Sequence, residues 1–167
     1  MHAQYQLRNK IYSVVDCSVE DIPSHIERVS SYWKESNTDI WYQSQLMKLA
    51  IDEGLALRVL DNTEEERLAI YIVLHRNSEH TANGYLLYTK DNRSLAMALD
   101  VYKRDKEIAK IFFMPHKLPP VPFSDIVEVS SIRKYHDFRK PLEVDLQKGK
   151  ALSFINKYFN LYDIQRV

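Results

Sequence analysis

The residues that most clearly favour a chemistry form a short polar junction in mid-chain, Lys90-Asp91-Asn92-Arg93-Ser94. The run before it is strand-like and the run after it has helical spacing, so we expect a strand to enter a helix N-terminus within Ala82–Ala109. Free backbone N–H groups and the positive end of a helix dipole meet at such a point. The chemistry that this arrangement favours is the binding of an anion, above all a phosphate.

Other reactive residue types give weaker indications. The histidines at positions 75, 80, 116 and 136 have no recognised ligand spacing with cysteine or carboxylate, so we expect no metal site. Cys17 follows a predicted strand and has no visible activating partner, which favours a buried or inert thiol over a nucleophile. A serine hydrolase is not indicated, because the chain contains no Gly-x-Ser-x-Gly element.

Charge gives no reason to expect a polyanionic partner. The segment Ser131–Lys140 combines four basic side chains with Tyr135, His136 and Phe138, a composition that can stack on nucleic acid. The whole chain, however, has 23 basic and 23 acidic residues and a net charge of zero. We therefore interpret Ser131–Lys140 as a solvated helix end, and the acidic run Glu64–Glu66 as a solvated hairpin tip, and we do not expect nucleic acid to be a partner.

Length and composition indicate one soluble domain. A chain of 167 residues that is 45% hydrophobic can bury one good core, so we expect a single domain over residues 1–167. No apolar run reaches the roughly 18 residues that span a membrane. One cysteine excludes an internal disulfide and fits a reducing compartment, so we expect a cytoplasmic protein. The sequence does not indicate an oligomeric state.

The first half of the chain predicts a strand, two helices and an antiparallel group of strands. Ser18 and Asp21 form a capping-box pattern ahead of the first helix, and Gly54 ends the second. Asn83-Gly84 is a turn dipeptide, so we expect a polar connection over His75–Asn83. The predicted elements are a strand at Lys10–Val15, helices at Ser18–Trp33 and Thr38–Glu53, and strands at Leu55–Leu60, Leu68–Leu74 and Tyr85–Thr89.

The second half predicts a strand–helix–strand unit followed by further alternation. After the junction, Leu95, Ala98, Leu99 and Tyr102 recur at helical spacing. The next strand is almost wholly apolar and follows a helix, which favours parallel pairing. The predicted elements after this helix are a strand at Ile108–Met114, a rigid external loop at Pro115–Pro122, a helix at Ser124–Tyr135, a strand at Leu142–Leu146 and a helix at Lys150–Tyr162. The fold class that follows is α+β, with a mixed, mainly antiparallel central sheet flanked by helices.

This element order, with its strand–helix junction in mid-chain, resembles the GNAT superfamily of N-acetyltransferases. Members hold the pyrophosphate of acetyl-CoA with a loop of the form Arg/Gln-x-x-Gly-x-Gly/Ala. The corresponding stretch here is Arg93-Ser94-Leu95-Ala96-Met97-Ala98, in which Arg93 and Ala98 match and Ala96 replaces the middle glycine. The resemblance implies acetyl-CoA as the cofactor, and these six residues as its binding site.

The resemblance does not assign catalytic residues. Many members carry a late helix with a Phe-Tyr-Glu-Lys-x-Gly-Phe-like stretch whose tyrosine can protonate the departing thiolate. Two stretches of this chain are similar to it, Ser131–Phe138 and Phe154–Leu161. When their lysines are aligned with that of the family, Ile132 and Ile155 stand where the tyrosine should be. Tyr135 or Tyr158 would serve only by reaching the same space from another position. No acidic residue is clearly indicated as the general base; Glu79 is conceivable, although its polar neighbours indicate an exposed loop.

The sequence therefore agrees with two alternative functions. The first is an acyl-CoA-dependent N-acetyltransferase whose amine substrate approaches across the central strands. The second is a non-catalytic protein-binding or structural module, for example a viral accessory or virion protein, that keeps the fold without the chemistry. In the second case a protein partner would engage the Pro115–Pro122 loop or an aromatic surface.

Overall fold

The computed structural model describes residues 3–33, 37–61, 70–89, 91–113, 125–128 and 142–167. Within these ranges, residues 28–33, 37–40, 61, 70–73 and 85–89 are described by their backbone alone.

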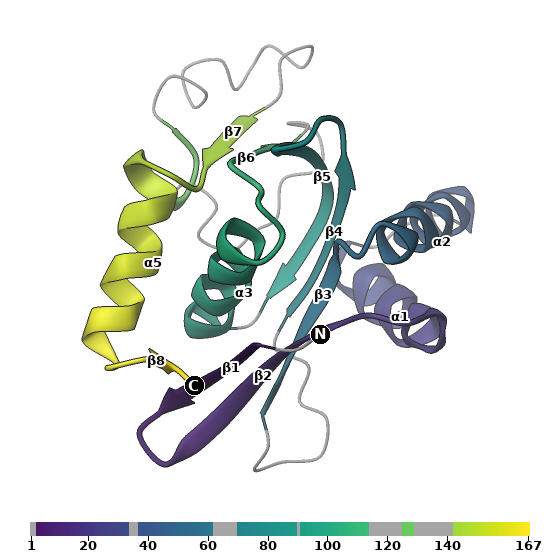
Figure 1. Cartoon of the computed structure of the whole chain (residues 1–167). Helices are drawn as coiled ribbons and strands as arrows, with labels where there is room; N and C mark the ends of the chain where they lie inside the picture. The colour runs from purple at the N-terminus through teal and green to yellow at the C-terminus, as the bar shows by residue number, and fades with distance from the viewer. Residues whose placement is uncertain (1–2, 34–36, 62–69, 90, 114–124, 129–141) are drawn as a thin grey trace.

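The described strands form one sheet in the order β7-β6-β5-β4-β3-β2-β1-β8 (Figure 1). All neighbouring strands in it are antiparallel except β5 and β6, which run parallel. The strands are β1 Ala3–Leu7, β2 Lys10–Asp16, β3 Ala56–Asp61, β4 Ile70–Arg76, β5 Thr81–Thr89, β6 Lys110–Phe113, β7 Leu142–Asp145 and β8 Gln165–Arg166. The predicted fold class, a mixed and mainly antiparallel sheet with a parallel strand–helix–strand unit, is confirmed.

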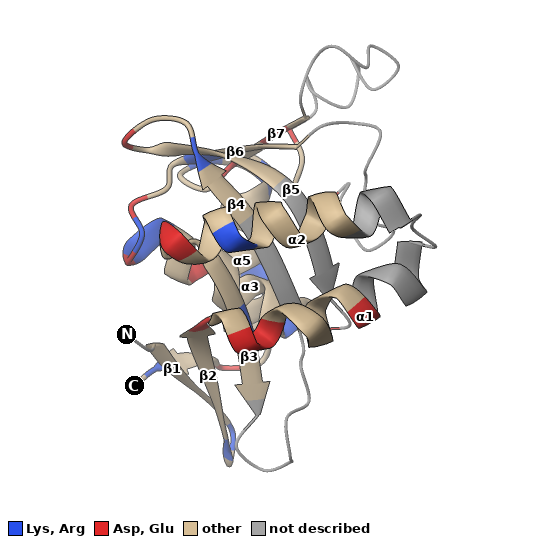
Figure 2. Cartoon of the chain, turned by 90° about the vertical axis from the view of Figure 1, so that its right-hand side faces the viewer, with Lys and Arg blue, Asp and Glu red and all other residues tan. Residues whose placement is uncertain are grey.

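Helices cover both faces of the sheet. Helices α1 (Ile22–Trp33) and α2 (Asn37–Asp52) lie on one face, and α3 (Asn92–Arg104) and α5 (Gly149–Leu161) lie on the other (Figure 1). The view turned by 90° has α1 and α2 in front of the sheet (Figure 2). The helix that connects β5 to β6 is therefore packed beside the helix that follows β7.

The entry to α1 is built as the sequence predicts. A short 3-10 turn, η1 (Val19–Asp21), precedes the helix, and the backbone N–H of Ser18 donates to Asp21 Oδ2 at 2.7 Å. The same carboxylate pairs with Arg58 of β3 at 2.9 Å, which ties the start of the helix to the sheet. The capping-box prediction is confirmed, and its acidic residue has a second role in tertiary structure.

The larger core lies between the sheet and the helices α3 and α5. Residues Ser94 to Tyr102 of α3 are all buried, because this helix is covered by the sheet on one side and by α5 on the other. Tyr102 donates a hydrogen bond from its hydroxyl to the carbonyl oxygen of Leu55 at 2.6 Å. This bond fixes α3 against the start of β3 without leaving a buried polar atom unpaired.

The strands β1 and β8, at one end of the sheet, were not predicted. Tyr5 of β1 donates from its hydroxyl to Asp100 Oδ2 of α3 at 2.6 Å, and Arg166 of β8 pairs with Asp105 at 2.6 Å. Both strands are thus held by side chains that reach α3 or the residue that follows it. Strand β8 is two residues long, so its pattern alone carries no strand signal.

The predicted turn at Asn83-Gly84 is wrong. Both residues lie inside β5, and the connection from β4 covers only the residues between Arg76 and Thr81. Gly84 is needed for close packing and not for a turn, since a Cβ built on it would lie 2.2 Å from Cε1 of Phe113. A glycine inside a strand often marks such a close approach.

Some predictions fall outside the described residues. They concern the Pro115–Pro122 loop, the acidic run Glu64–Glu66, the basic segment Ser131–Lys140 and nearly all of the helix at Ser124–Tyr135. Within the described ranges, no helix combines the length and the apolar character needed to cross a membrane.

Candidate functional site

The described pairing of the parallel strands β5 and β6 covers the first part of β5. Their pairing runs from Thr81 opposite Lys110 to Gly84 opposite Phe113. Strand β5 continues to Thr89, and β4 accompanies it over that length, with Ile70 opposite Thr89. The residues that follow Phe113 lie outside the described ranges, so the pairing on the β6 side of β5 is described for Thr81–Gly84.

A β-bulge lies within β5, on the side that pairs with β4. The register between β4 and β5 shifts so that Leu74 is opposite Gly84 while Val73 is opposite Leu86, which leaves Tyr85 as the extra residue. Bulges bend a strand and re-aim its backbone, and they occur next to binding sites more often than elsewhere. The bulge here directly follows Gly84, the last residue of β5 whose pairing with β6 is described.

The far end of β5 leads to the N-terminus of α3, as the sequence predicts. Asp91 is the N-cap residue, and its Oδ1 accepts from the backbone N–H of Arg93 at 2.9 Å. The Arg93 side chain also binds this carboxylate, with Nε 3.0 Å from Oδ1, and its pKa is raised mainly by that hydrogen bond. Ser94 Oγ donates to Asp91 Oδ2 at 3.3 Å. One carboxylate thus occupies the place where the first turn of a helix binds anions.

Aromatic residues of α5 complete the surroundings of this helix end. Asn92 Nδ2 donates to the hydroxyl of Tyr158 at 2.8 Å, and the Arg93 guanidinium lies 5.2 Å from the centre of the Tyr162 ring. The two tyrosine rings are parallel, with their centres 6.2 Å apart. We call Asp91, Asn92, Arg93, Tyr158 and Tyr162 the α3-terminus cluster. Because the C-terminal end of α5 adjoins the N-terminal end of α3, the two helix dipoles are favourably opposed.

The six residues of the predicted cofactor loop differ in their access to a ligand. Arg93 is about one-third exposed by its side chain (34%), whereas the other five side chains are buried. The Leu95 amide already donates to the carbonyl of Asp91 within the helix. Ala96 to Ala98 lie further along the helix, where amides bond to carbonyls four residues earlier. The donors at the end of α3 are therefore those of Asn92, Arg93 and Ser94.

The sequence analysis did not identify the roles of Asp91, Asn92 and Tyr162. An aspartate directly before a run of helical spacing is a common N-cap, so the role of Asp91 had a local signal. The contacts of Asn92 with Tyr158 and of Arg93 with Tyr162 have none, because they join positions more than sixty residues apart. Tyr158, which the tyrosine stretch singled out, contacts Asn92, the residue directly before the predicted cofactor loop.

A hollow lies along the N-terminal part of α5. It has a volume of about 390 Å³ and opens between residues 125–128 and the helix. The carboxylate Oε1 of Glu128 accepts from the Lys150 backbone N–H at 3.1 Å, so this helix N-terminus is already capped by an acidic group. Its lining contains two acidic and two basic side chains, and comprises Asp125, Glu128, Gly149, Lys150, Ser153, Phe154 and Lys157.

The sequence also drew attention to Cys17, Glu79 and Tyr135 as residues with reactive side chains. Cys17 is buried as predicted, and burial raises the pKa of its thiol to about 12. Glu79 is exposed, as its neighbours indicated, and lies in the connection between β4 and β5. Tyr135 lies outside the described residues. Among the residues that are described, no three His, Cys, Asp or Glu side chains gather in a way that would hold a metal ion.

No family model matches the chain, and no curated protein is significantly similar to it. Solved structures show a distant likeness. Ard1 from Thermoplasma volcanium is 12% identical, with 61% of this chain and 70% of that chain covered and a TM-score of 0.43. A chimera of the spermidine N-acetyltransferase SpeG from Vibrio cholerae and hSSAT is 13% identical, with 89% and 98% covered and a TM-score of 0.45. The Vibrio cholerae spermidine N-acetyltransferase in complex with CoA and spermine is 13% identical, with 84% and 98% covered and a TM-score of 0.43.

Matches this distant carry no argument about activity. The GNAT-like description of the fold therefore rests on the chain's own element order and on its parallel β5–β6 pair, joined through α3.

Proposed function

We propose that this protein binds an acyl-CoA alongside β5 and transfers its acyl group to an amine. The observation that supports the proposal is the course of β5, which has a bulge at Tyr85 and leads into the N-terminus of α3. The pantetheine arm of CoA contains amide groups, and amides pair with a strand edge as another strand would. In the transfer, the amine nitrogen forms a bond to the acyl carbon, the thioester C–S bond breaks, and the amine proton passes to the released thiolate.

The position of α3 after β5 indicates which way the ligand would lie along the strand. A ligand lying along Tyr85–Thr89 and continuing past Thr89 would bring its phosphates to the N-terminus of α3. Arg93 and the amides of the first turn are suitable donors for them. Asp91 opposes this binding, since its carboxylate accepts from the Arg93 amide and binds the Arg93 side chain. Phosphate binding at this end of the helix therefore requires the carboxylate to give up these two bonds.

Thermal unfolding with acetyl-CoA tests the binding step. At about 1 mM ligand and a dissociation constant of about 10 µM, binding to the native state adds about 2.7 kcal/mol. For a chain of this size that corresponds to a rise in melting temperature of roughly 5–10 °C. No rise, together with unchanged hydrogen exchange of the amides at Asn92–Ser94, would remove the acyl-CoA proposal.

Removing the charge of Asp91 sharpens the test. Asp91→Asn keeps a good N-cap while it removes the negative charge that competes with a phosphate, so we expect tighter binding of acetyl-CoA, by roughly tenfold. Asp163→Asn changes another carboxylate, one that accepts a hydrogen bond from the Gln165 side chain, and serves as the matched control. If Asp91→Asn binds no more tightly than Asp163→Asn, the phosphates do not lie at this helix end.

Transfer is tested separately from binding. Released thiol can be followed with a chromogenic disulfide reagent and a panel of primary amines, and buried Cys17 should contribute little background. Binding without thiol release would keep the ligand and overturn the transferase.

The α3-terminus cluster favours a second candidate, a non-catalytic module. Its five residues satisfy one another with a carboxylate cap, a tyrosine hydrogen bond and a cation–π contact, as a structural helix end requires. This candidate predicts no thermal shift with acetyl-CoA for the natural chain and none for Asp91→Asn.

A further inference from the structure

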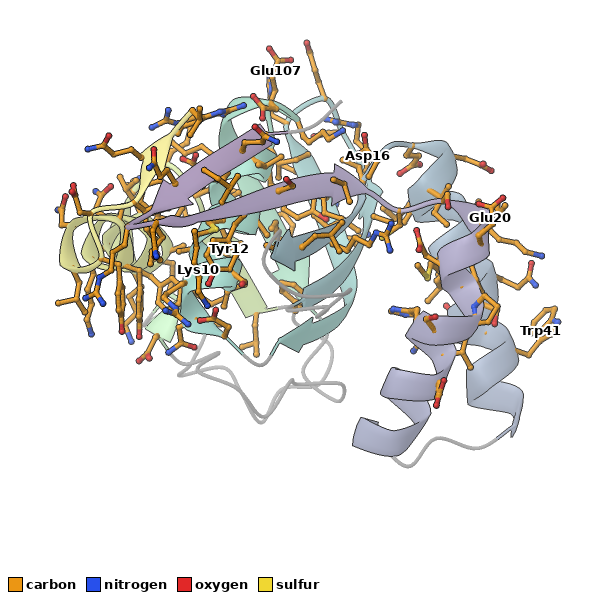
Figure 3. All side chains as sticks on the ribbon, turned by 90° about the horizontal axis from the view of Figure 1, so that it is seen from below. Lys10, Tyr12, Asp16, Glu20, Trp41 and Glu107 are labelled. Carbon is orange, nitrogen blue, oxygen red and sulfur yellow. The ribbon has the colours of Figure 1, made fainter. Side chains whose placement is uncertain are left out.

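Helix α2 has apolar side chains on both of its faces. Toward the sheet it buries Leu46, Met47 and Ala50. On the opposite face Trp41 is 64% exposed, Tyr42 is 52% exposed and Leu49 is 49% exposed. Figure 3 shows the Trp41 side chain pointing away from the rest of the molecule. We call the exposed face formed by Trp41, Tyr42, Gln45, Lys48, Leu49 and Asp52 the outer α2 face.

Single exposed apolar residues are ordinary, but neighbouring ones on one helix face indicate a contact surface. Trp41, Gln45 and Leu49 follow one another at intervals of four residues, so they form one line along the helix. Figure 2 shows this helix on the outside of the molecule, with few charged residues along it. The outer α2 face therefore has the shape and chemistry of a helix-packing surface whose partner is another helix.

We propose that the partner is a second copy of this chain, bound through an antiparallel pairing of the two α2 helices about Gln45. In that arrangement, Trp41 packs on Leu49 of the second copy, and the reverse contact follows from the twofold axis. Such an interface is isologous, because the same patch serves on both sides. The line of contact is self-complementary, since a bulky aromatic is opposed to an aliphatic residue at both ends.

The charges on this face support the same pairing. Tyr42 lies opposite Lys48 of the second copy, at a position that allows an ammonium to contact an aromatic face. Asp52 is the last residue of α2, where a negative charge is unfavourable for its own helix dipole. In the antiparallel pair each Asp52 lies beside the N-terminal end of the other α2, which begins at Asn37. The charge that is unfavourable in one copy is favourable in two.

The size of the face sets the strength of the dimer. Aromatic side chains bury about 150–250 Å² each, so Trp41, Tyr42 and Leu49 together offer about 350 Å² of exposed surface per copy. Two copies would bury on the order of 700 Å² through these residues, below the roughly 1,200–2,000 Å² of stable complexes. We therefore expect a reversible dimer that dissociates on dilution through the micromolar range.

Sedimentation velocity at protein concentrations from about 5 to 500 µM tests the proposal. We expect the natural chain to shift from monomer to dimer over this range, and Trp41→Asp to remain monomeric throughout. Leu161→Asp is the matched control, because Leu161 is equally exposed, at 63%, on a different helix. Both variants should keep the melting temperature measured in dilute solution, since neither side chain is buried.

A cross-link tests the geometry. Gln45 lies on the proposed twofold axis, so Gln45→Cys should be joined to itself by a short bis-maleimide, whereas Asn156→Cys, exposed on α5, should not. Buried Cys17 does not compete for the reagent. A monomer at every concentration, a dimer that survives Trp41→Asp, or equal cross-linking of the two cysteine variants would each overturn the proposal. Binding of some other protein to this face, with the chain itself monomeric, would overturn it as well.

Discussion

Replacing Gly84 with alanine tests how closely β5 and β6 are packed at the pair Gly84–Phe113. A Cβ at this position would lie 2.2 Å from Cε1, 2.4 Å from Cζ and 2.6 Å from Cδ1 of the Phe113 ring. Ordinary carbon–carbon contacts are about 3.5–4.0 Å, so the overlap is at least about 0.9 Å for each of the three ring atoms. Phe113 is 4% exposed, which leaves the ring little space to move into.

The expected cost follows from two opposing effects. Overpacking a filled core costs about 1–3 kcal/mol, while replacing a glycine stabilises by about 0.4–1 kcal/mol through the unfolded chain. We therefore expect Gly84→Ala to lower the free energy of unfolding by about 1–2 kcal/mol. Phe113→Leu removes the ring atoms that cause the overlap and should itself cost about 1–2 kcal/mol.

A double-mutant cycle measured by urea unfolding isolates the contact. In the Phe113→Leu background, Gly84→Ala should be close to neutral, within about 0.5 kcal/mol, so the coupling between the two changes should be about 1–2 kcal/mol. Costs that simply add within about 0.5 kcal/mol would show that the ring does not occupy the space beside Gly84. That result would refute the packing of the Phe113 ring against Gly84.

Three further predictions concern buried groups. Burial lowers the pKa of His25 to about 3, so stability present above pH 6.5 should be lost as the pH falls, by about 2 kcal/mol at pH 5, and His25→Leu should abolish most of this acid dependence in urea unfolding. Burial raises the pKa of Cys17 from 9.0 to about 12, so stability present below pH 9 should be lost as the pH rises; the natural chain should lose about 1–2 kcal/mol relative to Cys17→Ala between pH 8 and pH 10, and parallel profiles would contradict this. Tyr102→Phe leaves the carbonyl of Leu55 without the tyrosine hydroxyl and should cost about 1–3 kcal/mol by thermal unfolding, whereas an unchanged melting temperature would show that water replaces the bond.

Local patterns predicted most of the elements, because the spacing of apolar residues in the sequence matches the side of each element that is buried in the fold. The spacing of Leu95, Ala98, Leu99 and Tyr102 predicts a helix, and all four are buried in α3. The apolar run at Ile108–Met114 predicts a covered parallel strand, and β6 pairs with β5 in that sense. Where apolar residues recur with the period of a helix or a strand, the sequence is sufficient to predict the element and its buried side.

The errors fall where tertiary contacts override a local preference. Asn83-Gly84 has the composition of a turn, yet Gly84 is placed in a strand because the Phe113 ring needs the space of its missing Cβ. Strands β1 and β8 are held to α3 and the residue after it through Tyr5 and Arg166, whose partners lie 95 and 61 positions away. These partners are too distant in the chain to be identified from the neighbouring residues.

The candidate site divides in the same way. The sequence by itself determined that a strand would end in a helix N-terminus at Asp91–Ser94, since turn, cap and helical spacing are properties of neighbouring residues. Only the tertiary structure decided what surrounds that helix end, where α5 brings Tyr158 and Tyr162 against α3. The physical reason is that capping is a local interaction, whereas access to the cap depends on how distant elements pack around it.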